Sequence, residues 1–196
     1  MRRLARRRKN GYAAGVLVFA RFGSNNEAFV LLGADRSYAW SDFGGRSEAC
    51  DDAPVSTALR ELDEETLRMV VPEDLRLDQD PIISKTLCGH QYFMHVAMYR
   101  GDESAARAIV SDYAKTHETC RYAEKTQLRW FRWSTIRDLS CRAPIAEVSL
   151  RDVFRRTIVM RLDAVEASLV RLCDPPEYGP PDTPASPVQT ESDALS

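Results

Sequence analysis

The 196-residue sequence has no long apolar segment and no closely spaced cysteine pair. Its longest apolar run, AAGVLVFA at residues 13–20, is far shorter than the roughly 20 residues that a membrane-spanning helix needs. We therefore expect no membrane span. The basic segment MRRLARRRKN is followed by a run that resembles a strand, so we also expect no signal peptide.

The cysteines are odd in number and widely spaced, and no two of them form a CxxC pattern; they are Cys50, Cys88, Cys120, Cys141 and Cys173. This spacing argues against a disulfide framework and against a zinc site. Free cysteine is among the most buried residue types, so we expect inert, buried thiols. Reduced thiols indicate a cytoplasmic protein, with the nucleus as the alternative.

Charge is unevenly distributed, although the formal net charge is only −2. The first nine residues hold no acid, and the rest of the chain has 21 basic and 29 acidic residues, a net charge of −8. The basic residues of this arm are Arg2, Arg3, Arg6, Arg7, Arg8 and Lys9. They predict either contact with RNA, a membrane surface or an import receptor, or a flexible, solubilising terminus.

Residues 174–196 contain six prolines, five acids and no basic residue. Such a composition cannot bury enough apolar surface to offset the entropy of ordering, so it is typical of disorder. We expect one folded domain at residues 11–173, between a basic flexible arm at 1–10 and a disordered, proline-rich acidic tail at 174–196.

Hydrophobic periodicity within this domain predicts interspersed strands and helices. The expected strands are residues 12–21, 27–34, 40–45, 91–100 and 127–133, the first two joined by the turn FGSNN. The expected helices are residues 54–70, 103–116 and 145–173, with a short helical turn at 134–139. Elements in this order indicate an α/β domain in which helices pack on a central sheet.

The segment RELDEET, residues 60–66, places four carboxylates in five consecutive positions. Glu61, Glu64 and Glu65 are separated by helical steps, so we expect them to project together from the exposed side of helix 54–70. Such oxygen ligands suit Mg²⁺. The alternative is a solvated acidic face relieved by ion pairs of Glu64 with Arg60 and Arg68.

A glycine pair, Gly44–Gly45, ends the strand just before this helix. Glycine lets backbone carbonyls approach a metal or a phosphate closely. The two features together predict a metal-assisted phosphate site at a strand–loop–helix junction.

The stretch GGRSEACDDAPVSTALRELDEET resembles the Nudix box, G-x5-E-x7-R-E-U-x-E-E-x-G-U, where U is a bulky aliphatic residue. The core R-E-U-x-E-E matches fully at residues 60–65. The box-like segment spans residues 45–67, and similarity to flanking Nudix strands extends the resemblance over about residues 12–140.

Three departures from the box are visible. The upstream acid is Asp51 or Asp52 instead of glutamate, in a loop that is one residue longer. Leu67 replaces the late glycine and Arg68 replaces the aliphatic residue after it. Without that glycine, we expect the helix to continue to Val70.

The resemblance implies a Nudix-type α/β/α sandwich with a central mixed β-sheet. It also implies a pyrophosphohydrolase that cleaves a phosphoanhydride in nucleoside diphosphate-linked compounds. By carry-over, Glu61, Glu64 and Glu65 would hold Mg²⁺ or Mn²⁺ with help from the carbonyl of Gly44 or Gly45. The general base would be Glu61, Glu65 or the later Glu124, and Arg60 would orient the carboxylates and contact Asp51 or Asp52.

Substrate contacts are expected at Gly44, Gly45, His95 and Trp40, with core packing as the alternative for the last two. Trp130, Phe131 and Trp133 could stack a base or belong to the core. The basic arm favours RNA decapping as an alternative activity, and diphosphoinositol polyphosphates are a further substrate class. A catalytically silent Nudix-fold binding module is the alternative of another class; the three retained box glutamates favour activity.

Overall fold

The structure is a computed structural model that describes residues 11–86, 88–120, 122–141 and 148–173. The predicted basic arm, with Arg2, Arg3, Arg6, Arg7, Arg8 and Lys9, and the predicted acidic tail lie outside the described residues. Both remain predictions.

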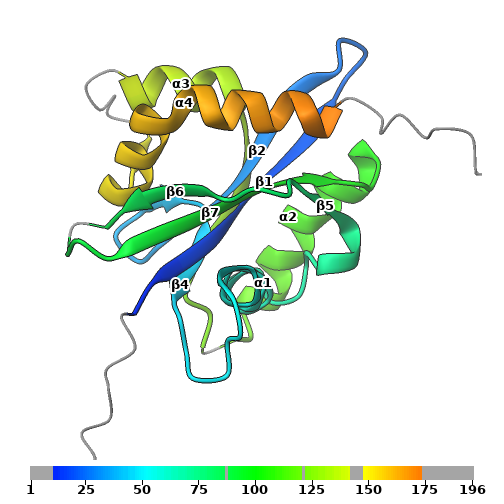
Figure 1. Ribbon diagram of the computed structural model, residues 1–196. Coiled ribbons are helices and arrows are strands. Elements are labelled where there is room, and N and C mark those ends of the chain that lie inside the picture. The colour runs from blue at the N-terminus through cyan, green and yellow to red at the C-terminus, as the bar shows by residue number, and fades with distance from the viewer. Residues whose placement is uncertain (1–10, 87, 121, 142–147, 174–196) are drawn as a thin grey trace, which may run out of the picture.

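The described residues form one nine-stranded mixed sheet (Figure 1). At its centre, β1 (Ala13–Phe22) pairs in parallel with β7 (Gln91–Tyr99) and antiparallel with β2 (Glu27–Ala34) and β4 (Phe43–Arg46). The other strands are β3 (Ala39–Ser41), β5 (Leu75–Leu77), β6 (Ile82–Lys85), β8 (Gln127–Arg132) and β9 (Ser149–Leu150). A 3₁₀ turn, η1 (Pro72–Asp74), precedes β5.

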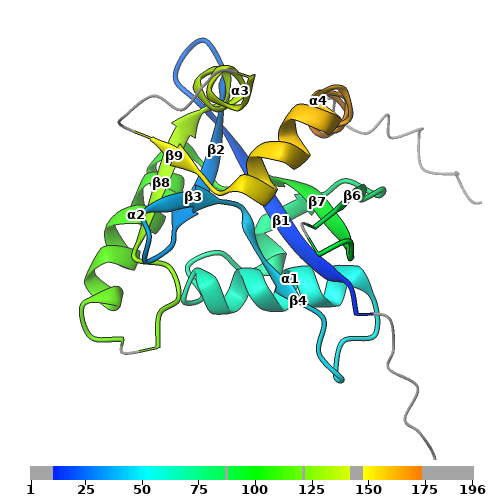
Figure 2. The ribbon, with the colours of Figure 1, turned by 90° about the vertical axis from the view of Figure 1, so that its left-hand side faces the viewer.

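Helices cover both faces of this sheet (Figures 1 and 2). One face carries α1 (Pro54–Glu65) and α2 (Glu103–His117), and the other carries α3 (Trp133–Cys141) and α4 (Asp152–Cys173). Alternation along β1 supplies both cores, because Leu17 packs with α3 and α4 while Val16 packs with α1 and α2. The predicted α/β/α sandwich with a central mixed sheet is confirmed. None of the described helices is both long enough and apolar enough to cross a membrane.

The prediction that the first helix continues to Val70 is wrong. α1 ends at Glu65, and Leu67 and Arg68 adopt left-handed conformations with φ of 53° and 63°. The backbone N–H of Arg68 donates to the Asp63 carbonyl at 2.9 Å, which closes the helix end. Leu67, at the position of the box glycine, therefore takes the conformation that glycine adopts most readily.

The last predicted helix also starts too early. Ser149–Leu150 form β9 beside β3, and the Arg151 N–H donates to the Trp40 carbonyl at 2.9 Å, so α4 begins only at Asp152. The predicted strand 40–45 is split into β3 and β4, and the short strands β5 and β6 were not predicted. The remaining expected elements agree with the structure to within two residues at each end.

The five cysteines are free, as predicted, but they are not buried. Cys50, Cys88 and Cys141 are exposed, while Cys120 and Cys173 are partly covered. The prediction failed because these cysteines lie in loops and at helix ends, outside the buried stripes that periodicity identifies.

Candidate active site

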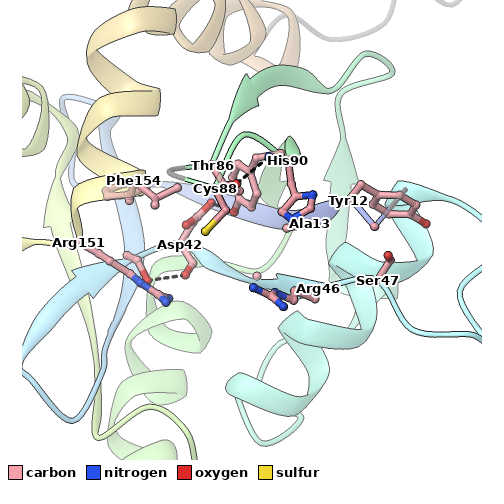
Figure 3. Close-up of a pocket in the computed structure, with 16 residues that line it drawn as sticks. Tyr12, Ala13, Asp42, Arg46, Ser47, Thr86, Cys88, His90, Arg151 and Phe154 are labelled. Atoms are coloured by element: carbon pink, nitrogen blue, oxygen red, sulfur yellow. Dashed lines mark hydrogen bonds between the residues drawn. The ribbon is translucent and has the colours of Figure 1, made fainter. Parts of the chain in front are cut away.

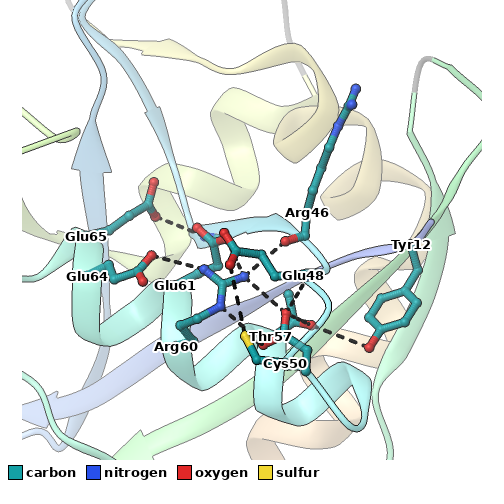
Figure 4. A network of polar contacts seen from close by, with 11 residues as sticks. Tyr12, Arg46, Glu48, Cys50, Thr57, Arg60, Glu61, Glu64 and Glu65 are labelled. Atoms are coloured by element: carbon teal, nitrogen blue, oxygen red, sulfur yellow. Dashed lines mark hydrogen bonds and ion pairs between the residues drawn. The ribbon is translucent and has the colours of Figure 1, made fainter.

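Arg60, in the middle of α1, is the centre of a polar network (Figure 4). Its guanidinium contacts both carboxylate oxygens of Asp51 at 3.2 Å, Glu61 at 2.9 Å and Glu64 at 3.0 Å. It also donates to the Arg46 carbonyl at 3.0 Å. Arg60 therefore ties the loop before α1 to the acidic turn of the helix, and the loop acid that it contacts is Asp51, not Asp52.

Asp51 is held by several donors. Its carboxylate accepts hydrogen bonds from the Thr57 hydroxyl at 2.9 Å and from the Glu48 N–H at 2.7 Å. Hydrogen bonding to Arg60, more than any other contact, lowers the pKa of Asp51 to about 2. The charged form of Asp51 thus stabilises the start of α1.

We expect Asp51→Asn to destabilise the fold by about 1–2 kcal/mol at neutral pH, because it removes charge-assisted hydrogen bonds. Since the pKa of Asp51 is lowered from 3.8 to about 2 by folding, its contribution is present above pH 3.8 and is lost as the pH falls through 2. Thermal unfolding of the wild type and of Asp51→Asn should show that the difference in stability between them shrinks from pH 7 to pH 2. Asp52→Asn, at an exposed neighbour, is the control. A loss of stability in Asp51→Asn that does not change with pH would contradict the stabilising role of the Asp51 charge.

The prediction that all three glutamates of α1 project from the exposed side of the helix is wrong, because two of them are covered. The side chain of Glu64 is 57% exposed, that of Glu61 is 12% exposed and that of Glu65 is 5% exposed. The cause is the close packing of α1 on β4. There the Gly44 N–H donates to Glu65 Oε2 at 2.9 Å.

The glycine pair of β4 makes this approach possible. A Cβ on Gly45 would lie 2.4 Å from the carboxylate atoms of Glu61. A Cβ on Gly44 would lie 2.7 Å from the Ala14 carbonyl oxygen on the neighbouring strand. A side chain at Gly44 would therefore clash with backbone, and one at Gly45 would displace the Glu61 carboxylate, which is held directly against the backbone of β4.

Lys125, which sequence reasoning missed, is the cationic partner of Glu65. Its side chain is 2% exposed, and its Nζ lies 3.1 Å from Glu65 Oε1. Burial raises the pKa of Glu65 to about 7, although Lys125 and the Gly44 N–H favour the charged form. Local sequence gives no signal for this contact, because a single lysine in a polar loop is normally exposed.

Glu61 is also affected by its surroundings. Burial raises its pKa, Arg60 opposes this shift, and Glu64 and Glu124 add to it. The exposed Glu124, the later acidic candidate, is thus one of the charges that act on Glu61.

The fit of this site to a divalent metal is partial. Within the described residues, no three histidine, cysteine or acidic side chains are arranged to hold a metal ion. Glu61 and Glu64 face Arg60, and both oxygens of Glu65 have partners. Glu61 and Glu64 supply hard oxygen donors of the kind that Mg²⁺ and Mn²⁺ prefer, and Glu61 lies beside the backbone of Gly45.

A cavity of about 420 Å³ adjoins the glycine pair. Figure 3 shows side chains from several elements around it. Gly44, Gly45 and Arg46 come from β4, Tyr12 precedes β1, Cys88 and His90 lie between β6 and β7, and Arg151 and Phe154 lie at the start of α4. The same glycine backbone thus contacts Glu61 and lines the cavity.

The structure places Trp40 and His95 in the packed interior instead of this cavity, which corrects their expected role in substrate binding. Trp40 is 8% exposed, and its ring packs against Phe131 with centroids 4.9 Å apart. His95 is 5% exposed, burial lowers its pKa, and its Nε2 has no hydrogen-bond partner in the described part of the chain. Neither residue lines the cavity.

The other aromatic candidates also belong to the packing. Trp133 packs against Phe19 with centroids 5.2 Å apart. The indole of Trp130 packs against Phe22 and donates to the Ala106 carbonyl at 2.7 Å. The structure therefore supports the alternative that these aromatic residues belong to the core.

No protein-family model matches the sequence, and no curated protein matches it. Solved structures do match. A MutT/Nudix family protein from Listeria innocua has a TM-score of 0.53 at 13% identity, with 82% of this chain and 97% of that chain covered. NrtR from Shewanella oneidensis has a TM-score of 0.51 at 17% identity, with 82% and 63% covered, so this chain spans less than two thirds of NrtR.

RenU, a Nudix hydrolase from M. smegmatis, has a TM-score of 0.50 at 18% identity, with 82% of this chain and 88% of that chain covered. Similarity at such identities establishes the fold, while function has to be argued from the site. The chain has the Nudix fold, and the glutamates of its box-like segment lie on α1, beside the glycine pair of β4.

Proposed function

We propose that this protein is a divalent-metal-dependent pyrophosphohydrolase that cleaves a phosphoanhydride in nucleoside diphosphate-linked compounds. The observation that carries this proposal is the position of Gly45. Its backbone touches the Glu61 carboxylate and also lines the cavity of about 420 Å³. None of the α1 glutamates lines the cavity itself, so Gly45 is the link between Glu61 and a diphosphate bound there.

Glu61, Glu64 and the Gly45 carbonyl are the groups that would hold Mg²⁺ or Mn²⁺. A bound metal would neutralise the charge of the diphosphate and lower the pKa of the attacking water. Arg60 positions Glu61 and Glu64 through its contacts of 2.9 Å and 3.0 Å. Because Arg60 also contacts Asp51, these carboxylates are oriented by the loop before the helix.

The cavity suits a substrate with one aromatic and one anionic part. Its volume of about 420 Å³ is in the range of small-molecule sites. Tyr12 and Phe154 offer aromatic surface, while Arg46 and Arg151 offer donors for phosphate oxygens. These residues support a nucleotide derivative as the substrate class.

A catalytically silent Nudix-fold binding module is the second candidate. The observation that favours it is the pairing of every box carboxylate with a cation, Glu61 and Glu64 with Arg60 and Glu65 with Lys125. In that case the cavity would bind a nucleotide derivative without cleaving it.

A substrate panel separates the two candidates. Product release would be measured from nucleotide diphosphate derivatives, diphosphoinositol polyphosphates and cap-labelled RNA, each with Mg²⁺, with Mn²⁺ and with EDTA. We expect turnover of at least one nucleotide diphosphate derivative with either metal, and none with EDTA. Ligand-induced thermal stabilisation without turnover of any compound would support the silent module and exclude the hydrolase.

A further inference from the structure

Lys125 occupies an oxygen-lined position inside the site. Its Nζ lies 3.1 Å from Glu65 Oε1 and 3.0 Å from Ser41 Oγ, with the Asp42 carbonyl oxygen at a longer 3.4 Å. All three residues that supply these acceptor oxygens are buried, and the lysine itself is 2% exposed. A carboxylate, a hydroxyl and a carbonyl are the oxygen types that usually bind a hard cation, and here an ammonium group lies among them.

The surrounding elements leave room for the long side chain of Lys125. A Cβ on Gly33 of β2 would lie 2.8 Å from both Cγ and Cδ of Lys125, so glycine leaves the space for the lysine stem. The Tyr113 hydroxyl of α2 donates to the Lys125 carbonyl at 2.6 Å. The next residue, Thr126, donates its N–H to the Ala34 carbonyl of β2 at 2.8 Å. The backbone of Lys125 is thus fixed by two neighbouring elements.

Each carboxylate oxygen of Glu65 already has a partner in this arrangement. Oε1 faces Lys125, and Oε2 accepts the Gly44 N–H at 2.9 Å. A divalent ion bound at Glu65 would lie within a few ångströms of the ammonium, and like charges at that distance repel strongly in a buried site. The lysine stem is packed over Gly33 and cannot turn away without leaving the core.

We propose that the ammonium of Lys125 is a built-in cation that takes the place of a divalent metal at Glu65. This inference rests on the proposed function in one respect, since it leaves Glu61 and Glu64 as the carboxylates that bind metal. Glu65 then acts as a positioning residue, because it holds Gly44 and so fixes the glycine pair against Glu61.

Mn²⁺ binding tests this assignment without relying on activity. The number of Mn²⁺ ions bound per chain would be measured from the electron paramagnetic resonance signal of free Mn²⁺ for the wild type, Glu65→Gln, Lys125→Met and the double variant. Methionine keeps an unbranched stem without the charge. We expect Glu65→Gln to bind as many ions as the wild type, and Lys125→Met to bind one more, which the double variant loses.

The inference is overturned if Glu65→Gln alone loses a bound ion or if folded Lys125→Met gains none. Should Lys125→Met fail to fold, the comparison of the wild type with Glu65→Gln still decides. A wild type that binds no Mn²⁺ would refute the proposed metal site but not the role of Lys125. In that event, the inference would still be supported if Lys125→Met bound one ion that the double variant did not bind. It would be overturned if Lys125→Met bound none.

Discussion

Glu61→Gln is expected to lower the rate of phosphoanhydride hydrolysis by about 100-fold or more, a loss of at least ~2.7 kcal/mol of transition-state stabilisation. The reason is the position of Glu61, whose carboxylate is 12% exposed and lies against Gly45, a residue that lines the cavity. Glutamine keeps the shape of the side chain but is a weaker metal ligand without negative charge. The measurement is steady-state turnover of the best substrate of the panel over a range of Mg²⁺ concentrations.

This variant should fold normally. Burial, together with the charges of Glu64 and Glu124, raises the pKa of Glu61 despite Arg60, so the electrostatic cost of its charge outweighs the gain from Arg60. We therefore expect a change in unfolding free energy within about 1 kcal/mol.

Asp63→Asn is the matched control for Glu61→Gln. It makes the same chemical change on the same helix, at a residue that pairs with the exposed Arg68 at 3.2 Å, outside the site. Its turnover should stay within about threefold of the wild type, because a surface ion pair contributes little. Equal activity of Glu61→Gln and Asp63→Asn would remove Glu61 from the proposed metal site.

Gly45→Ala should also reduce turnover by about 100-fold, and it should act through Glu61. The added Cβ would lie 2.4 Å from the Glu61 carboxylate. Pairing of Gly45 with Ala14 holds the strand in place, so the glutamate has to move. Because the clash is with the far end of a flexible side chain, the loss of stability should stay below about 1 kcal/mol, which thermal unfolding would check.

A double-mutant cycle identifies the cause of this loss. If Gly45→Ala acts by displacing Glu61, the double variant with Glu61→Gln should be no slower than either single variant. Gly11→Ala serves as the control, since nothing lies within 4 Å of the Cβ that it would add. Losses that multiply in the double variant would mean that Gly45 acts independently of Glu61.

Local sequence was sufficient for part of this description. The apolar, strand-forming runs at residues 12–21 and 27–34 predicted β1 and β2, and the apolar periodicity of residues 103–116 predicted α2. These elements follow from periodicity, which depends only on residues that are close in the chain. The R-E-L-x-E-E core also marked Arg60 and its glutamates, because the motif and its contacts lie within one helix and the loop before it.

Some local predictions failed for a local reason. The end of α1 depends on left-handed conformations at Leu67 and Arg68, and sequence rules assign these to glycine. Closure of the helix by backbone hydrogen bonds and burial of Thr66, whose hydroxyl donates to the Leu62 carbonyl at 2.7 Å, stabilise the turn without glycine.

The sequence by itself thus determined that strands and amphipathic helices are interspersed along the chain, and it determined the acidic turn of α1. Only the tertiary structure decided that Trp40 and His95 are core residues, that Glu65 is buried, and that Lys125 is its partner. The physical reason is that these outcomes depend on sheet pairing and packing between distant segments. Lys125 reaches Glu65 because the chain at Thr126 pairs with β2, and Glu65 is buried because two glycines let α1 approach β4.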